Sequence, residues 1–323
     1  MFKKRWFSTF MALTLLLCAV CGCSAAPEEE DLVELGGLLD EMVPLSSAPP
    51  LEAFLAPEAP GTATQSNSSA VIDYSNAADG YVMVKWTGGG SSRIKVQIKG
   101  PNNSEKYTYD LRTDGTYETF PLSDGNGKYA IQVLKQVSGT EYSPVLTANV
   151  NAKLTDEFAP FIRPNQYVNY SEDSAVVAKA ADLIAKAEVT ENLDKVGVIY
   201  DWVINNLTYD TAKAKSVPKG YLPDVDAVME AGKGICFDYA ALMAAMLRSQ
   251  GVPIKLVVGW TGSQYHAWIN VWSEDGGWVD GIIYFDGKDW KLMDPTYASS
   301  GRQSRSIMEY IGNGANYKAR FLY

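Results

Sequence analysis

The chain has 323 residues and a formal net charge of −10, with 46% hydrophobic and 11% aromatic residues. This length suggests about two domains of roughly 150 residues each, and the composition is sufficient for packed cores. An acidic chain without a cluster of basic residues argues against a nucleic acid as partner.

Residues 1–22 have the pattern of a signal peptide. Basic residues at positions 3–5 precede an apolar stretch, residues 10–20, that is too short to span a bilayer comfortably. The Val-Cys-Gly-Cys-Ser segment that follows resembles the lipobox of bacterial lipoproteins. This resemblance implies cleavage before Cys23 and lipidation of its thiol, so we expect a protein anchored to the outer face of the bacterial cytoplasmic membrane. An ordinary signal peptide, cleaved after Ala25 or Ala26, is the alternative.

Residues 23–68 have the composition of a linker. Prolines and acidic residues are frequent, and no Lys or Arg occurs between Ser24 and Val84. Such a segment buries little apolar surface and repels itself, so it should stay extended and disordered.

Residues 69–152 predict a β-domain. Short runs rich in β-branched and aromatic residues are separated by Gly, Asn and Asp turn signals. The expected strands are 81–86, 93–98, 106–111, 117–121, 129–136 and 142–150. Six or seven short strands at this spacing favour an immunoglobulin-like β-sandwich. No catalytic cluster falls within it.

Residues 153–323 predict a second domain of class α+β. Helical periodicity covers 173–187, 190–207 (with Thr190 as the N-cap), 226–231 and 235–250. The last of these is apolar on nearly all sides, so it should be buried in the middle of the domain. Strand patterns then follow at 254–260, 265–272, 278–284 and 290–293. Helices followed by a run of antiparallel strands indicate an α+β fold.

Cys236 opens the buried helix and is the only cysteine outside the N-terminal segment. Unpaired N–H groups and the helix dipole favour a thiolate at this position. A neighbouring N–H group could hold a developing oxyanion, and glycine at position 234 would let a substrate backbone come close. The alternative is that Cys236 is a small buried apolar residue.

His266, the only histidine, lies in an aromatic strand, where it shares a face with Trp268 and Asn270. That face would have to meet the start of the Cys236 helix. Asp294 ends a later strand just before a proline, and its carboxylate could orient the imidazole. Three other aspartates compete with it by spacing alone, at positions 280, 286 and 289. A structural imidazole and an Asx turn are the alternatives for His266 and Asp294.

Four segments in this order resemble the transglutaminase-like domain of the papain-like thiol enzymes. They are residues 234–242 (GICFDYAAL), 251–253 (GVP), 265–268 (YHAW) and 290–296 (WKLMDPT), and residues 199–210 are similar to the family's lead-in helix. The resemblance implies a Cys-His-Asp triad of Cys236, His266 and Asp294, and a central helix packed on an antiparallel sheet. Many members complete the oxyanion hole with an upstream aromatic donor, and Tyr209 is the candidate for that role.

The expected activity is acyl transfer from an amide in a protein or peptide substrate, through a thioester on Cys236. Transfer to water would make the protein a protease or peptidase, and transfer to an amine would make it a cross-linking transamidase. Hydrolysis is favoured because a surface protein meets water in great excess. A non-catalytic surface binding protein is the alternative. Tyr221, Trp260, Tyr265 and Trp268 are candidates to line the acyl groove. No metal or cofactor is expected, because one histidine and one free cysteine are too few ligands for a zinc site.

Overall fold

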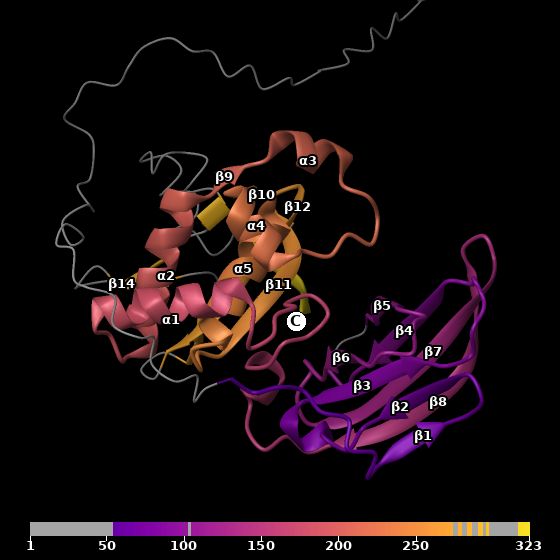
Figure 1. Ribbon diagram of the computed structural model, residues 1–323. Helices are drawn as coiled ribbons and strands as arrows, with labels where there is room; N and C mark the ends of the chain where they lie inside the picture. Colours follow the sequence, from indigo (N-terminus) through magenta and orange to yellow (C-terminus); the bar gives the residue numbers. More distant parts are fainter. Residues whose placement is uncertain are drawn as a thin grey trace, which may run out of the picture. The chain divides into compact units, whose positions relative to one another are not determined.

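The computed structural model describes residues 54–102, 105–273, 277–279, 283–285, 290–292, 295–296 and 316–323. Antiparallel strands between residues 64 and 152 precede a region of helices and strands (Figure 1), which confirms the predicted α+β class with a preceding β-sandwich. Among the described helices, none has both the length and the apolar character needed to cross a membrane. The predicted signal peptide, Cys23 and the linker up to residue 53 lie outside the described residues.

The β-sandwich consists of two four-stranded antiparallel sheets, with the orders β1-β2-β3-β6 and β5-β4-β7-β8. Alternating apolar residues of both sheets, such as Val82 and Val84 of one and Ile131 and Val133 of the other, are buried in the core between them. The strands are β1 (Thr64–Ser66), β2 (Ala70–Asp73), β3 (Tyr81–Trp86), β4 (Ile94–Lys99), β5 (Tyr107–Leu111), β6 (Glu118–Pro121), β7 (Gly127–Ser138) and β8 (Glu141–Ala152).

The end of the predicted linker differs from the expectation, because it is bound to the first sheet. The Glu58 N–H donates to the Tyr81 hydroxyl at 3.1 Å, and the Gly61 N–H donates to the Asp73 carboxylate at 2.7 Å. Residues Thr64–Ser66 then pair with β2 as an edge strand. The composition of the linker did not indicate these contacts, since the hydrogen-bond acceptors are side chains that follow the segment in sequence.

The second region contains five helices among its described residues. They are α1 (Ala175–Ala187), α2 (Asn192–Asn206), α3 (Thr211–Ser216), α4 (Val225–Ala231) and α5 (Cys236–Arg248). The 3-10 turn η2 (Ala159–Phe161) precedes α1, and η1 (Ala77–Asp79) lies between β2 and β3. The N-cap of α2 is Glu191, not Thr190, and its side chain makes no capping hydrogen bond. The short helix α3 was not expected from the sequence.

A four-stranded antiparallel sheet of order β13-β12-β11-β16 lies beside α5. The predicted strand over 278–284 is split, because β13 pairs with β12 whereas β14 pairs with β15. Strand β16, which the sequence did not suggest, pairs with β11 at the other edge. The strands are β11 (Ile254–Thr261), β12 (Gln264–Ser273), β13 (Gly277–Val279), β14 (Ile283–Phe285), β15 (Trp290–Leu292) and β16 (Tyr317–Leu322), with the short parallel pair β9 (Thr208–Tyr209) and β10 (Lys233–Gly234) before α5.

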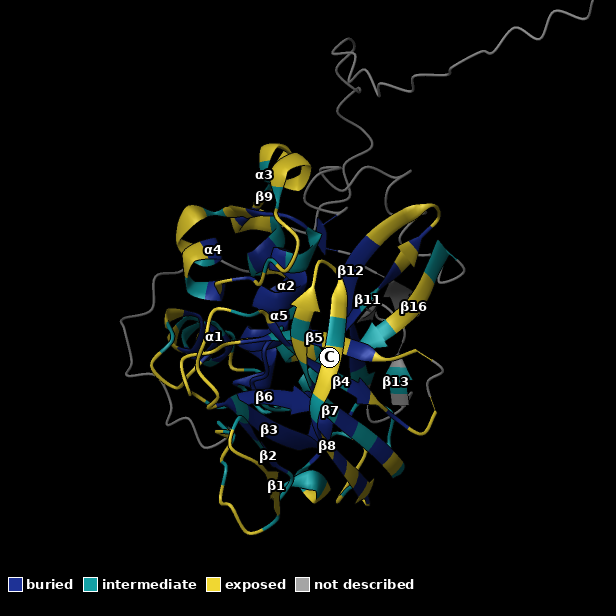
Figure 2. Cartoon of the chain, turned by 90° about the vertical axis from the view of Figure 1, so that its right-hand side faces the viewer, coloured by how far each residue is buried: buried dark blue, intermediate teal, exposed yellow. Residues whose placement is uncertain are grey.

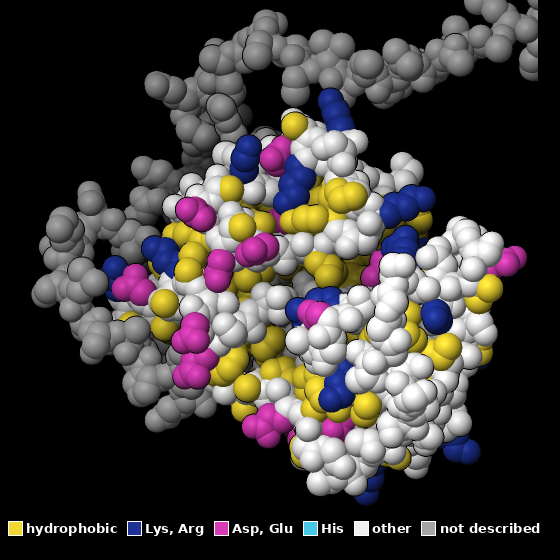
Figure 3. Space-filling view, turned by 45° about the vertical axis from the view of Figure 1, so that its right-hand side comes forward, with side chains coloured by type: hydrophobic (Ala, Val, Ile, Leu, Met, Phe, Trp, Pro, Cys, Tyr) yellow, Lys and Arg dark blue, Asp and Glu magenta, His cyan; other side chains and the backbone are white. Residues whose placement is uncertain are grey.

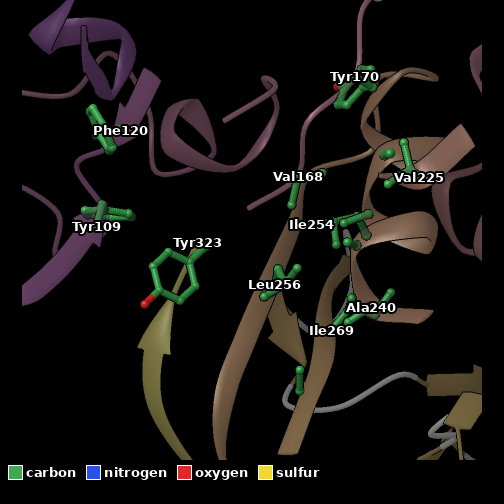
Figure 4. Close-up of a cluster of buried hydrophobic side chains, with 14 of the residues drawn as sticks. Tyr109, Phe120, Val168, Tyr170, Val225, Ala240, Ile254, Leu256, Ile269 and Tyr323 are labelled. Carbon is green, nitrogen blue, oxygen red and sulfur yellow. The ribbon is translucent and has the colours of Figure 1, made fainter. Parts of the chain in front are cut away.

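Helix α5 is central, as its apolar sequence predicted. Every residue from Asp238 to Arg248 is buried, and the helix contacts α1, α2, β11 and β12 (Figure 2). The core continues towards the β-sandwich through Tyr323, which follows β16. Its N–H donates to the Leu256 carbonyl at 2.8 Å, and its ring meets that of Tyr109 with centroids 5.8 Å apart (Figure 4).

Arg248, the last residue of α5, is fully buried and binds only backbone carbonyls among the described residues. Its guanidinium donates to Ile254 O and Tyr323 O, each at 2.6 Å, and to Arg163 O at 2.9 Å. Burial lowers the pKa of Arg248 to about 10, so the group stays charged at neutral pH. The Arg248 side chain therefore joins the end of α5 to β11, to the C-terminal strand and to the loop that contains Arg163.

Replacing Arg248 with methionine should lower the free energy of unfolding by about 3 kcal/mol, because buried carbonyls lose their donors. Urea denaturation would measure the loss. Arg93, whose side chain is 57% exposed in an ion pair with Asp110, is the matched control. Arg93→Met should cost no more than about 1 kcal/mol, and an equal loss in both variants would contradict the structural role of Arg248.

Candidate active site

Cys236 is the first residue of α5 and is a free, partly exposed thiol. The preceding Ile235 has an extended backbone, which turns the chain from β10 into the helix. The first N–H groups of α5 have no partner within the helix, and the positive end of its dipole lies at the thiol. Nucleophilic cysteines are often found at such helix N-termini.

Asp238 explains why a helix starts here although Ile235 has no side chain that can cap it. The Asp238 carboxylate, fully buried, accepts a hydrogen bond from the Ile235 N–H at 2.8 Å. A Cβ at Gly234 would lie 2.6 Å from the Asp238 Cβ, so only glycine fits. We expected Gly234 to leave room for a substrate backbone. The structure gives another reason for this glycine, because the Asp238 side chain occupies that space.

Two further donors converge on the same carboxylate. Lys213 Nζ lies 2.6 Å from Asp238 Oδ2, and the Tyr221 hydroxyl donates to Asp238 Oδ1 at 2.5 Å. Lys213 Nζ also lies 2.6 Å from the Tyr221 hydroxyl oxygen. Burial and the hydrogen bond to Asp238 raise the pKa of Tyr221 well above its usual range, so its hydroxyl stays protonated. We call Lys213, Tyr221 and Asp238 the Asp238 clasp.

The clasp holds the segment of residues 211–221, whose apolar contacts are the partly buried Val217 and the Tyr221 ring, which meets that of Phe237 at 6.4 Å. Helix α3 contains no buried residue and is exposed in Figure 2. Asp210 caps it by accepting from the Lys213 N–H at 2.8 Å. With so little buried surface, the position of this segment next to Cys236 depends on the polar contacts to Asp238.

Lys213→Met should lower the free energy of unfolding by about 3 kcal/mol, because it leaves the buried Asp238 carboxylate without its cation. Chemical denaturation would measure the change. Lys215 is exposed on the same helix, so Lys215→Met is the matched control and should change stability by less than about 0.5 kcal/mol. Equal stabilities for the two variants would mean that the ion pair of the clasp does not support the fold.

Tyr209, the candidate oxyanion donor, ends β9 and is half-buried. Burial, and next the charge of an ionised Cys236, raise the pKa of the Tyr209 hydroxyl above its usual value. The phenol is therefore a neutral hydrogen-bond donor at physiological pH, which a residue that stabilises an oxyanion must be.

His266 lies in β12 opposite Gly259 of β11 and is 4% exposed. As predicted, it shares a face with Trp268 and Asn270: the His266 and Trp268 rings stack with centroids 6.1 Å apart, and the Trp268 indole N–H donates to Asn270 Oδ1 at 3.1 Å. The core that β12 shares with α5 is made by the alternating residues on the opposite face, which are Ala267, Ile269 and Val271.

One cavity of about 660 Å³ is lined by Cys236, His266 and Tyr209 together. Tyr221 and Tyr265 also line it, as the sequence suggested, whereas Trp260 and Trp268 are not among its lining residues. The volume suits a bound segment of peptide. Asp294 and the competing aspartates at 280, 286 and 289 lie outside the described residues, so the third member of the predicted triad stays a prediction.

A second cavity, of about 690 Å³, is lined by residues such as Met83, Tyr117, Asn165 and Tyr170. None of its described lining residues is a cysteine or a histidine. The chemistry that the sequence predicts therefore belongs to the cavity at Cys236, although the two are similar in size.

Two features of the site were missed by the sequence analysis. The first is the Asp238 clasp. A signal for it was available in the sequence, because an acid stands at the third position of a helix whose N-cap residue cannot cap it. The second is the contribution of the β-sandwich, because Glu105, Lys106 and Thr108 line the Cys236 cavity. No local sequence pattern indicated this contact between distant segments.

Residues 178–280 match the family described as "Transglutaminase-like superfamily". The "Uncharacterized protein YebA" of Bacillus subtilis (strain 168) is 29% identical over 213 residues, which are 59% of this chain and 28% of that protein. A "Protein-glutamine gamma-glutamyltransferase" of Pseudomonas aeruginosa is 28% identical over 109 residues, covering 29% of this chain and 14% of that protein. The human "Kyphoscoliosis peptidase" is 29% identical over 121 residues, covering 37% of this chain and 17% of that protein.

The chain thus spans less than a third of the length of each of these relatives. The matched residues contain α5, Cys236 and His266. Over residues 178–280 the chain is therefore similar to the transglutaminase-like superfamily.

Proposed function

We propose that this protein is an extracytoplasmic acyl-transfer enzyme that uses a thiol nucleophile to cleave amide bonds in protein or peptide substrates. The observation that carries this proposal is the shared cavity of Cys236 and His266, with the thiol at the start of a buried helix. A transferase and a peptidase among the similar proteins support acyl transfer as the class of reaction.

In the proposed mechanism, Cys236 Sγ attacks the amide carbonyl carbon, and His266 takes the thiol proton. The oxyanion is held by N–H groups at the start of α5 and by the Tyr209 hydroxyl. The C–N bond then breaks as His266 gives its proton to the departing amine, which leaves an acyl thioester on Cys236. Water attacks the thioester, His266 accepts its proton, and a carboxylic acid is released as the thiol re-forms. Asp294 is proposed to orient the imidazole.

Transamidation is the second candidate, because the first half-reaction is the same and one relative is named a transferase. In that case an amine attacks the thioester and forms a new amide. Incubating the protein with a peptide library, with and without an added primary amine, and weighing the products separates the two. A gain of 18 mass units summed over the products indicates hydrolysis, and amine adducts indicate transamidation. Unchanged peptides under both conditions would reject acyl transfer and favour a non-catalytic binding protein.

Tyr209→Phe should lower kcat by about 10²-fold with little change in KM, because it removes one donor to the oxyanion and leaves the ring in place. Steady-state kinetics on a cleaved peptide would measure it. Tyr74→Phe, a partly buried tyrosine of the β-sandwich, is the control. An unchanged kcat in Tyr209→Phe would take the oxyanion role away from Tyr209.

We also propose that the N-terminal segment attaches the protein to the outer face of the cytoplasmic membrane through lipid on Cys23. The support is the sequence pattern of residues 1–24. Mass analysis of the N-terminal peptide from a membrane fraction would detect the lipid, and Cys23→Ala should release the protein into the soluble fraction.

A further inference from the structure

Among the described residues that line the Cys236 cavity, Glu105, Lys106 and Arg320 are charged. We call the four segments that contribute lining residues and also hold charged side chains the rim of the cavity: 105–108, 209–221, 233–238 and 316–323. Each acid in these segments forms an ion pair with a base of the same set. The pairs are Glu105 with Arg320, Asp210 with Lys233, and Asp238 with Lys213.

Four lysines of these segments are left outside the ion pairs of the described residues: Lys106, Lys215, Lys219 and Lys318. All four are exposed. Lys106 lines the cavity itself, and Lys215 and Lys219 adjoin Ala214 and Gly220, which line it. Within these four described segments, basic side chains thus outnumber acidic ones by seven to three, although the chain as a whole has a net charge of −10.

In Figure 3, basic side chains lie on both sides of a strip of hydrophobic side chains in the upper part of the view, with acidic side chains also present there. The cavity also has an aromatic wall: Tyr265 lines it at 49% exposure, and its ring meets that of Trp260 at 5.1 Å. Apolar surface next to positive charge suits a peptide that has both apolar and acidic side chains.

We propose that the acyl donor is an acidic peptide segment, whose carboxylates on either side of the reacting amide are held by Lys106, Lys215, Lys219 and Lys318. This inference rests on the proposed acyl-transfer function. The Asp238 clasp gives it a structural basis, because the clasp fixes the segment that carries Lys215 and Lys219. Exposed charges act mainly on encounter and weak binding, so the preference should appear in KM and should weaken with salt.

The test uses two peptides that are cleaved by the wild-type protein and differ only in Glu or Gln on both sides of the reacting amide. We expect kcat/KM for the Glu peptide to exceed that for the Gln peptide by about tenfold at low ionic strength. At about 1 M salt, where the screening length is near 3 Å, the two values should converge. The variant in which all four lysines are replaced by glutamine should lose the preference at low salt.

The matched control replaces four exposed lysines of the β-sandwich with glutamine: Lys99, Lys128, Lys135 and Lys153. It changes the net charge equally and should keep the preference. Equal kcat/KM for both peptides in the wild-type protein, or a preference that survives loss of the rim lysines, would overturn the inference. So would a result in which the rim variant loses only its binding to phosphatidylglycerol vesicles. Failure of the wild-type protein to cleave any peptide would instead reject the proposed function.

Discussion

Cys236→Ala is expected to abolish turnover, with a loss of at least about 10⁴-fold in kcat, because no other described residue carries a thiol that could form the thioester. The melting temperature should hardly change. Cys236 is only partly buried at the first position of α5, where alanine is a good helix former and no described hydrogen bond is lost. Steady-state kinetics and thermal unfolding of the same preparation would measure both quantities.

Cys236→Ser is the conservative companion, since it keeps the size of the side chain and replaces sulfur with a far less acidic hydroxyl. It should be nearly as inactive as the alanine variant and should still bind substrate, because the cavity is unaltered. If either variant kept a rate within a few fold of the wild type, Cys236 would have no place in the reaction.

His266→Gln should lower kcat by about 10³-fold, because it removes the group proposed to take the thiol proton and return it to the leaving amine. Glutamine preserves a polar side chain at a buried position, so the fold should survive. The chain has no second histidine that could substitute. Kinetics with a cleaved peptide give the loss in rate, and the alkylation rate of Cys236 by iodoacetamide at pH 6 reports on the ionised thiol.

The two readouts in His266→Gln separate a catalytic role from a structural one. A catalytic imidazole predicts slower turnover and slower alkylation at an unchanged melting temperature. Wild-type turnover, or a loss of rate that follows the melting temperature, would show that His266 serves only the packing of β12 with Trp268. Tyr265→Phe, on the same strand, should leave the alkylation rate unchanged.

Much of the fold was predictable because its elements are locally encoded. Alternating apolar residues in β7, for example Tyr129, Ile131 and Val133, identify a strand with one buried face. The apolar sequence of α5 identified a central helix. Asp224 and Gly232 mark the two ends of α4 as ordinary capping residues. These signals lie within one element and need no knowledge of its neighbours.

The elements that were missed depend on distant partners. Strand β1 is a three-residue edge strand in a segment of linker composition, and it forms only because β2 offers it a free edge. Strand β16 pairs with β11 although it lies about 60 residues further along the chain. Helix α3 has no apolar face and is held by Lys213 on Asp238. Single-sequence patterns carry no signal for such contacts.

The candidate site was predictable to a similar extent. Cys236 and His266 were identified by local context and motif order, and both line one cavity. The clasp and the rim of lysines were not identified. The clasp joins side chains up to 25 positions apart, and the rim joins lysines more than 100 positions apart, from Lys106 to Lys318. The proposed chemistry is thus suggested by short motifs, whereas the environment of Cys236 and His266 is a property of the folded chain.

The most direct test of this account is the mass of the protein trapped during turnover. The wild-type protein, mixed with a cleaved peptide and quenched in acid within milliseconds, should carry one acyl group of the peptide, located on Cys236 and removed by hydroxylamine. Continued turnover after Cys236 has been fully alkylated, with no acyl group on that residue, would contradict the account.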